Sequence, residues 1–397
     1  MLSRARMGTS LTFALGGLLC GVWVARMPAL KDKFDLTTGS VGFTLLVWGL
    51  AAVIAMQGLR GVIARTDSRT VLRIAAPLAA LSAALIGLAP TFPLLIVAVG
   101  VFGMAFGVMD VSMNAQGSVV EQAYGRPLMS GMHAGWCVGA MSGGLLGAAT
   151  AALALSFTQS VLLAALIALP VSLAVGRTYL ADPVARVTGI GPARTRLPLV
   201  VYLIGGLAFL AFMAEGAIAD WSGLLLHENL GATEAVAALG YPLFEAAMLC
   251  GRLIGDRLRT RLGTRRLLMT AGLGTSVATT LVVASPSTPY ALVGFFLTGL
   301  MVCTVVPTMI SLAGTVAPGQ SAASVAQVGA MGYGGLLLGP VVIGFLAEAS
   351  SVRAGMSIIV VLAVLMTVAF RFIPIPQATD LASAETLPTG ERELLAA

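Results

Sequence analysis

The chain has 397 residues, of which 58% are apolar and only 10% are charged. Soluble domains carry about 25% charged residues, so this composition excludes a water-soluble globular protein and predicts one embedded in the lipid bilayer. The net charge of +6 would suggest nucleic-acid binding in a soluble protein. In a membrane protein it is explained by the distribution of Arg between loops, and we expect no nucleic-acid partner.

Apolar segments recur along the whole chain with short polar breaks. Each is long enough to cross a bilayer as a helix, since a span needs about 20 apolar residues. They predict an all-α membrane protein with twelve spans, at 8–30, 39–61, 70–89, 93–119, 128–151, 157–176, 197–226, 233–253, 265–284, 288–313, 321–347 and 352–373.

The loops predict the orientation of the chain. If the N-terminus is cytoplasmic, 19 of the 23 basic residues fall on the inner side. This positive-inside bias predicts that both termini are cytoplasmic, and we expect the bacterial inner (plasma) membrane. The Arg-rich segment 177–196 is the one long interior break, and it separates a six-helix bundle (1–176) from a second one (197–373), which a disordered cytoplasmic tail (374–397) follows.

The two halves contain related sequence. Val138-Gly139-Ala140-Met141 recurs 190 residues later as Val328-Gly329-Ala330-Met331, and the basic loops after the second and eighth spans recur at a similar offset. This repetition, with six helices on each side of the break, predicts two pseudo-symmetric bundles, a known plan of transporters.

Short motifs resemble the major facilitator superfamily over essentially the whole chain. The loop after the eighth span contains Gly251, Arg252, Asp256 and Arg257. The corresponding loop of the first half contains Gly61 and Arg65, but Ala64 stands where this superfamily usually has Asp. The resemblance implies a secondary transporter with this twelve-helix fold, and the departure at Ala64 puts a charge-relay gate in doubt on that side.

A second resemblance is narrower. Gly107-Val108-Met109-Asp110, Asn114, Glu121, Gly125-Arg126-Pro127 and His133 are similar to the fucose-proton symporter-like branch of the superfamily. It implies symport, with Asp110 as the proton-coupling and substrate-side carboxylate.

Placing an acidic residue in the middle of the bilayer costs roughly 2.5–3.5 kcal/mol of insertion free energy, so each such residue is a candidate for a functional role. Asp110, Asn114 and Glu121 form one polar stripe on the fourth span, as expected of a wall around a water-filled cavity. Desolvation would help Asp110 to hold a proton, although a permanent structural pairing is the alternative. Glu245 is the deepest acid of the second half and the second candidate for coupling or substrate binding, and Glu215 and His133 are further candidates.

Arg26 and Asp220 are near repeat-equivalents at the outer ends of the first and seventh spans. We expect an outer gate in which Arg26 pairs with Asp220 or Glu215. The alternative is that Arg26 only reaches toward lipid headgroups.

A glycine stripe in the fifth span predicts close helix packing, because a surface without side chains lets another helix approach. We expect it to contact the eighth span, across the two halves, as the seam of a rocking motion. Its members are Gly131, Gly135, Gly139, Gly143 and Gly147.

These patterns together predict a proton-coupled secondary active transporter of a small polar solute, which works by alternating access as a monomer. The narrower resemblance makes a sugar the candidate solute. A proton-driven exporter of drugs or secondary metabolites is the alternative, and a non-transporting membrane receptor is a third possibility. An enzyme is not expected, because the two His are far apart and no HExxH or GxSxG motif occurs. Lone cysteines without CxxC spacing predict no metal site, and we expect no cofactor.

Overall fold

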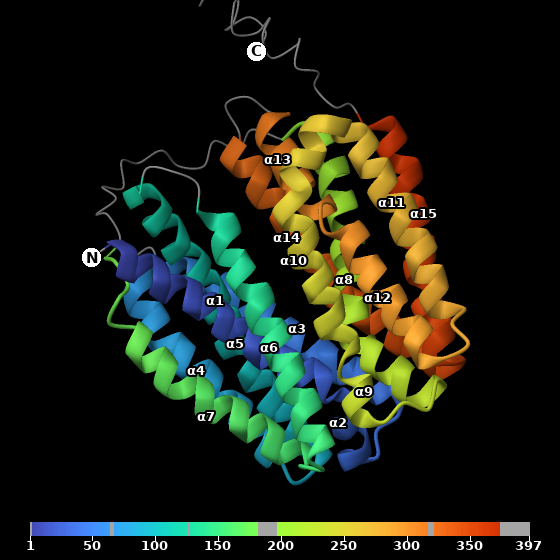
Figure 1. Cartoon of the computed structure of the whole chain (residues 1–397). Coiled ribbons are helices and arrows are strands. Elements are labelled where there is room, and N and C mark those ends of the chain that lie inside the picture. Colours follow the sequence, from blue (N-terminus) through green and yellow to red (C-terminus); the bar gives the residue numbers. More distant parts are fainter. Residues whose placement is uncertain (1, 64–66, 125–127, 182–196, 317–320, 374–397) are drawn as a thin grey trace, which may run out of the picture.

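The protein is described by a computed structural model, which covers residues 2–63, 67–124, 128–181, 197–316 and 321–373. The described chain is helical throughout (Figure 1). The first bundle contains α1 (Leu2–Ala25), α2 (Met27–Phe34), α3 (Thr38–Ile63), α4 (Ser68–Leu88), α5 (Phe92–Tyr124), α6 (Met129–Ala152) and α7 (Phe157–Val175). The second contains α8 (Leu199–Leu224), a π turn (Leu225–Asn229), α9 (Glu234–Ala237), α10 (Gly240–Leu262), α11 (Thr264–Val283), α12 (Thr288–Val302), α13 (Val305–Thr315), α14 (Ser321–Ala349) and α15 (Val352–Phe372).

The predicted fold class is confirmed. Eleven of the described segments are long and apolar enough to cross a membrane, and the Gly-rich α6 occupies the position of the remaining predicted span. Apolar side chains are exposed along the outer faces of the helices, where lipid would cover them; they include Leu166, Leu203, Leu253, Val293 and Val368.

Proline explains where the structure divides predicted spans. The first span ends at Ala25, and Pro28 then occupies the first turn of α2, where its missing N–H is not needed. Pro307 likewise lies in the first turn of α13, just after the break at Cys303 and Thr304 between α12 and α13.

Side-chain caps fix several helix starts. The Asp67 carboxylate accepts a 2.7 Å hydrogen bond from the backbone N–H of Thr70 at the start of α4. Ser156 and Gln159 form a reciprocal capping box at the start of α7. Caps of this kind satisfy backbone donors that have no partner inside the helix.

The glycine stripe packs within the first bundle. A Cβ atom on Gly139 would overlap with the carbonyl oxygen of Ala14 in α1, and one on Gly143 would overlap with that of Leu18. The prediction that this stripe faces the eighth span is therefore wrong at Gly135, Gly139 and Gly143, which lie on the α1 backbone; Gly147 also meets α1, at Ala25, and Gly131 has nothing within 4 Å. The contact of α6 with α10 is made instead by Gly144, which meets Pro242.

The same packing recurs in the second bundle. There Gly335 lies on the carbonyl oxygen of Phe209, and Gly339 on that of Met213, both in α8. The equivalent glycines of α6 and α14 are thus 196 residues apart. The short Val-Gly-Ala-Met match at 190 residues indicated the repeat, but it is six residues out of the register in which the helices pack.

The two bundles meet at the end of the molecule that carries α2 and α9, whereas the first turn of α1 and the last turn of α15 lie at the other end (Figure 1). Gly42 of α3 packs on Gly344 of α14, and Gly49 packs on Leu337. These contacts, and that of Gly144 with Pro242, all lie in the parts of the helices nearer to α2 and α9. The described chain is therefore closed at this end.

Candidate functional site

Asp110 of α5 makes a direct contact with the other bundle. Its Oδ2 accepts a 2.9 Å hydrogen bond from the hydroxyl of Tyr333 in α14. Asn114, one turn away, donates to the Asp110 backbone carbonyl at 2.9 Å and lies 3.4 Å from Oδ1. Asp110 is only 9% exposed, and neither of the two ion pairs found among the described residues involves it. The side-chain partner of this buried carboxyl from the other bundle is thus an uncharged hydroxyl and not a basic group.

Aromatic rings flank this contact on both sides. The ring of Tyr333 stacks on Phe212 of α8, with centroids 6.1 Å apart and planes at 16°. In the first bundle Phe106, one turn from Asp110 on α5, lies 6.0 Å from both Trp48 and Trp136. The Nε1 of Trp48 is buried and has no hydrogen-bond partner in the part of the chain that the structure describes.

A second group of charges lies between α8, α10 and α6. Glu245 is 6% exposed and lies beside the Cys137 thiol and the Tyr241 hydroxyl. Arg252, two turns along α10, donates from Nη1 to Cys137 Sγ at 2.9 Å and is within electrostatic range of Glu215 and Glu245. Three buried atoms of this group have no hydrogen-bond partner among the described residues, namely Glu215 Oε1, Glu245 Oε2 and Arg252 Nε.

Helix α1 passes within reach of both groups. The Cys20 thiol of α1 is within electrostatic range of Asp110, Asp220 and Glu245. We call Asp110, Glu215, Asp220, Glu245 and Arg252 the central charged cluster. It brings together residues of α5, α8 and α10, and hence of both bundles.

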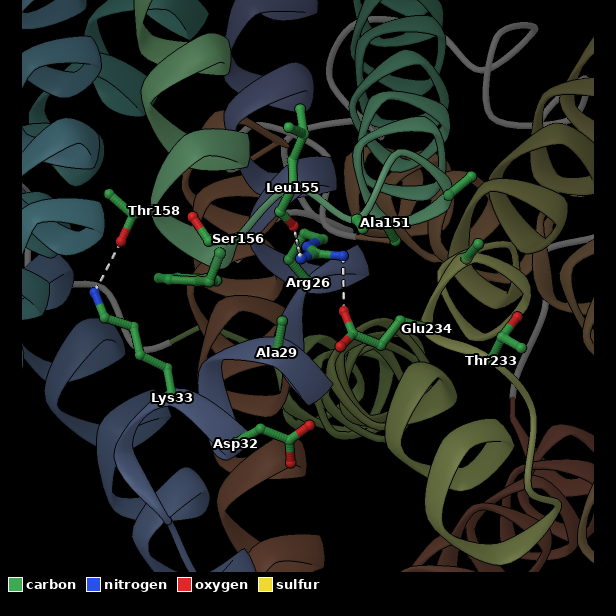
Figure 2. A pocket seen from close by; sticks show the side chains of 14 residues that line it. Arg26, Ala29, Asp32, Lys33, Ala151, Leu155, Ser156, Thr158, Thr233 and Glu234 are labelled. Carbon is green, nitrogen blue, oxygen red and sulfur yellow. Dashed lines mark hydrogen bonds and ion pairs between the residues drawn. The ribbon is translucent and has the colours of Figure 1, made fainter.

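Arg26 joins the bundles at the closed end. Its Nη1 lies 2.7 Å from the Glu234 carboxylate of α9, and its Nη2 donates to the Leu155 carbonyl at 2.8 Å. Figure 2 shows the guanidinium between these two partners, which line a pocket of about 850 Å³. The side chain of Arg26 is only 3% exposed, whereas Glu234 is 36% exposed. The expected partners Asp220 and Glu215 are not the ones that Arg26 contacts.

Two further polar contacts connect the bundles at this end. Lys31 of α2 pairs with Glu228 of the π turn at 2.5 Å. Glu348 of α14 accepts hydrogen bonds from Thr38 and from the backbone N–H of Gly39. With Arg26 and Glu234, these residues form what we call the outer latch.

Lys33 holds the first bundle together beside the latch. Its Nζ donates to the carbonyls of Gly87 and Ala89 at the end of α4 and to Thr158 in α7 (Figure 2). Burial lowers the pKa of this ammonium below its ordinary value. Lys33 therefore binds helix ends rather than a solute.

Other sequence candidates have local partners. His133 of α6 lies against the ring of Phe13 in α1, with centroids 4.9 Å apart. Glu121 accepts a hydrogen bond from the backbone N–H of Leu128 and connects α5 to α6. Gln116 donates to the Leu180 carbonyl.

The inner-loop motif is described only in part. Arg65 lies outside the described residues, as do the side chain of Asp256, most of the predicted linker and the predicted tail. Gly61 lies in α3 and Arg257 is exposed on α10, where Gly251 approaches the Cys303 thiol of the α12–α13 break. Arg252 is turned inward to Cys137 rather than toward the loop.

Sequence reasoning missed three partners. Nothing in the sequence spacing of Tyr333 places it opposite Asp110. Glu234 lies in a four-residue helix that follows a π turn, so its position depends on a reversal of the chain. The pair of Lys31 and Glu228 offered one signal, since each is charged at an end of a predicted span.

Comparisons with known proteins agree with this architecture. The sequence profile of the Major Facilitator Superfamily matches residues 203–396. The chain is 36% identical to the "uncharacterized transporter y4wD" of Sinorhizobium fredii, over 91% of this chain and 96% of that one. It is 34% identical to an "uncharacterized MFS-type transporter" of Yersinia pestis, over 92% and 94% of the two chains.

Two solved structures share the fold at low sequence identity. The nucleoside transporter NupG superposes with a TM-score of 0.73 at 15% identity, over 93% of this chain and 98% of that one. A bacterial homologue of the human lysosomal transporter Spinster, in an inward-facing and occupied conformation, superposes with a TM-score of 0.77 at 15% identity, over 95% and 98%.

Proposed function

The chain belongs to the major facilitator superfamily, and from this premise we propose that it couples the movement of a small polar solute to that of protons by alternating access. As a member of this family with transporter-named relatives, it is a multi-pass membrane transporter and not an enzyme. What the proposal adds is the coupling ion, the solute class and the residues.

The contact between Asp110 and Tyr333 carries the proposal. A charged carboxylate buried at this depth without a counter-charge is costly, whereas a protonated one is tolerated. Because Tyr333 belongs to the other bundle, separating the bundles would remove a hydrogen bond from Asp110. Movement of the bundles would thus change how strongly the Asp110 carboxyl holds its proton, which is the requirement for coupling.

The closed end supports alternating access. All three contacts of the outer latch join one bundle to the other, and they would have to break when that end opens. We propose that this end faces the outside, that the termini face the cytoplasm and that the protein works as a monomer in a bacterial inner membrane, with a sugar of the kind carried by the fucose-proton symporter-like branch among the candidate solutes.

The test measures internal pH in proteoliposomes that contain a pH-sensitive dye, while neutral monosaccharides, polyols and amines are added outside in turn. At least one solute should drive proton movement in the wild-type protein. Asp110→Asn should abolish it, because the amide cannot release a proton. Tyr333→Phe keeps the ring but removes the donor, and it should reduce the rate severalfold.

Asp35→Asn is the matched control. Asp35 is an exposed residue with φ 50°, a conformation that Asn accepts readily, so the same acid-to-amide change should leave proton movement intact. Undiminished proton movement in Asp110→Asn would overturn the assignment of Asp110. Apolar drugs that move protons where polar solutes do not would favour the exporter.

A further inference from the structure

The central charged cluster contains more acidic than basic side chains. Its four carboxyl groups belong to Asp110, Glu215, Asp220 and Glu245, and three of these residues are less than 10% exposed. Among the described residues of the cluster, Arg252 is the one cation. The other buried Arg, Arg26, is engaged by Glu234 at the closed end.

Two carboxylate oxygens of the cluster accept no hydrogen bond from the described residues. Glu245 Oε2 and Glu215 Oε1 are buried and without a hydrogen-bond partner in the described chain. The nearby Arg252 donates one of its hydrogen bonds to the Cys137 thiol and not to these oxygens. A buried acceptor without a donor costs about 1–3 kcal/mol, and more when it is charged. These oxygens are therefore suited to a ligand that brings hydrogen-bond donors and positive charge.

Aromatic faces lie between the two ends of the cluster. Phe212 precedes Glu215 by three residues on α8, so both side chains lie on one face of that helix. Phe212 stacks on Tyr333, whose hydroxyl binds Asp110. Carboxylates beside the faces of aromatic rings are the surroundings that an ammonium group prefers, since both attract positive charge.

Other solute classes fit these groups less well. An anion would be repelled by carboxylates that outnumber the single guanidinium. A neutral sugar would supply donors but no positive charge, so it would not stabilise Glu215 and Glu245 in their ionised form at membrane depth. A protonated amine supplies both.

We propose that the transported solute is a small organic cation, a protonated amine with a polar body, whose ammonium group binds Glu245 and Glu215 beside the rings of Phe212 and Tyr333. This rests on the proposed transport function and names its solute class. Asp110 remains the coupling carboxyl, and Arg252 acts as a positioning residue that limits the negative charge at the binding pair.

The test compares amines with neutral analogues of the same shape. The pairs are glucosamine with N-acetylglucosamine, putrescine with 1,4-butanediol, and choline with 3,3-dimethylbutan-1-ol. Binding to the purified full-length protein is measured by thermal shift and calorimetry. At least one amine should bind tenfold or more tightly than its neutral partner. Glu245→Gln should weaken that binding at least tenfold, and Glu215→Gln should weaken it as well.

Asp35→Asn is again the matched control and should bind the amine as the wild-type protein does. If a Gln variant fails to fold, the comparison of each amine with its neutral analogue on the wild-type protein still decides the matter. Binding of only neutral members, or of none, overturns the organic-cation proposal.

Proteoliposome assays separate the two proposals. Proton movement driven by neutral sugars alone would leave the transport function standing and refute the cation site. Tight amine binding that is sensitive to Glu245→Gln but moves neither solute nor protons would support the site and refute coupled transport.

Discussion

Asp110 and Glu245 show two ways in which this fold keeps an acid at membrane depth. Asp110 has a neutral donor from the opposite bundle, so its environment depends on how the bundles meet. Glu245 has Arg252 within electrostatic range on its own helix, so this pairing travels with the second bundle even though the Cys137 thiol beside both residues belongs to the first. We therefore expect Asp110 to sense the conformational change and Glu245 to remain a binding group throughout it.

Asp67 offers a prediction about stability at a single residue. Asp67→Ala removes the cap of α4 and should lower the free energy of unfolding by about 1 kcal/mol at neutral pH. Asp67→Asn keeps a capping oxygen and should cost much less. Chemical denaturation of the purified proteins measures both, and equal losses in the two variants would contradict the capping role.

The pH dependence of this cap has a definite sign. Hydrogen bonds from Thr70 hold the pKa of Asp67 below its ordinary value of 3.8. A carboxyl whose folded pKa is lowered stabilises the fold above its unfolded pKa, and this contribution is lost as the pH falls through the folded value. The difference between wild type and Asp67→Ala should thus be constant near neutral pH and shrink below about pH 4.

At the scale of elements, the same arrangement recurs in both bundles: the glycine face of one helix packs directly against the backbone of a neighbouring helix. The α6 glycines lie on α1, and the α14 glycines lie on α8 in the same way. Contacts of this kind leave no room for sliding, because interior packing does not deform continuously. We infer that α1 with α6, and α8 with α14, each move as one unit.

Substitution of these glycines tests the packing. A Cβ on Gly139 would overlap with the Ala14 carbonyl, so Gly139→Ala should destabilise the protein by about 1–3 kcal/mol. Gly131 lies on the same helix with nothing within 4 Å of an added Cβ, so Gly131→Ala should be neutral or slightly stabilising. Thermal unfolding in detergent compares the two, and indistinguishable stabilities would refute the close approach at Gly139.

Most of the membrane-spanning helices could be predicted from the sequence, but fewer of the contacts within the candidate site could. Apolar length and the Arg-rich loops predicted the spans, because the bilayer sets one length for all of them. The predicted partner of the glycine stripe, the eighth span, was wrong, because a face without side chains indicates close packing but does not identify the helix that packs on it. Arg26 was expected to pair with Asp220 or Glu215, but its partner is Glu234 because the chain turns back after α8.

At the scale of the whole molecule, the outer latch holds one end of the bundles together. Charge reversal tests it, because a broken buried pair leaves an unpaired charge. Arg26→Glu and Glu234→Arg should each slow transport about tenfold or more, and the double variant should recover part of the rate.

Opening of that end can be followed with Cys20 in a protein whose other three cysteines are replaced by Ser. A membrane-impermeant thiol reagent added from outside should label Cys20 faster in Arg26→Glu than in the parent, and the double variant should reverse the increase. Equal labelling in all three proteins would show that the pair does not hold the end closed.

Because part of the outer latch is exposed to solvent, the salt concentration on the outside should affect how firmly this end is closed. Lys31 and Glu228 are 18% and 28% exposed, and in the other pair Arg26 is 3% exposed while Glu234 is 36% exposed. The Debye length falls from about 10 Å at 0.1 M salt to about 3 Å at 1 M, so salt weakens the Lys31–Glu228 pair more than the pair whose guanidinium is buried. Concentrated salt outside should therefore weaken one contact of the outer latch without altering the central charged cluster. Transport rates measured in dilute and in concentrated buffers will then differ, because salt shifts the equilibrium between the closed and the open state of this end.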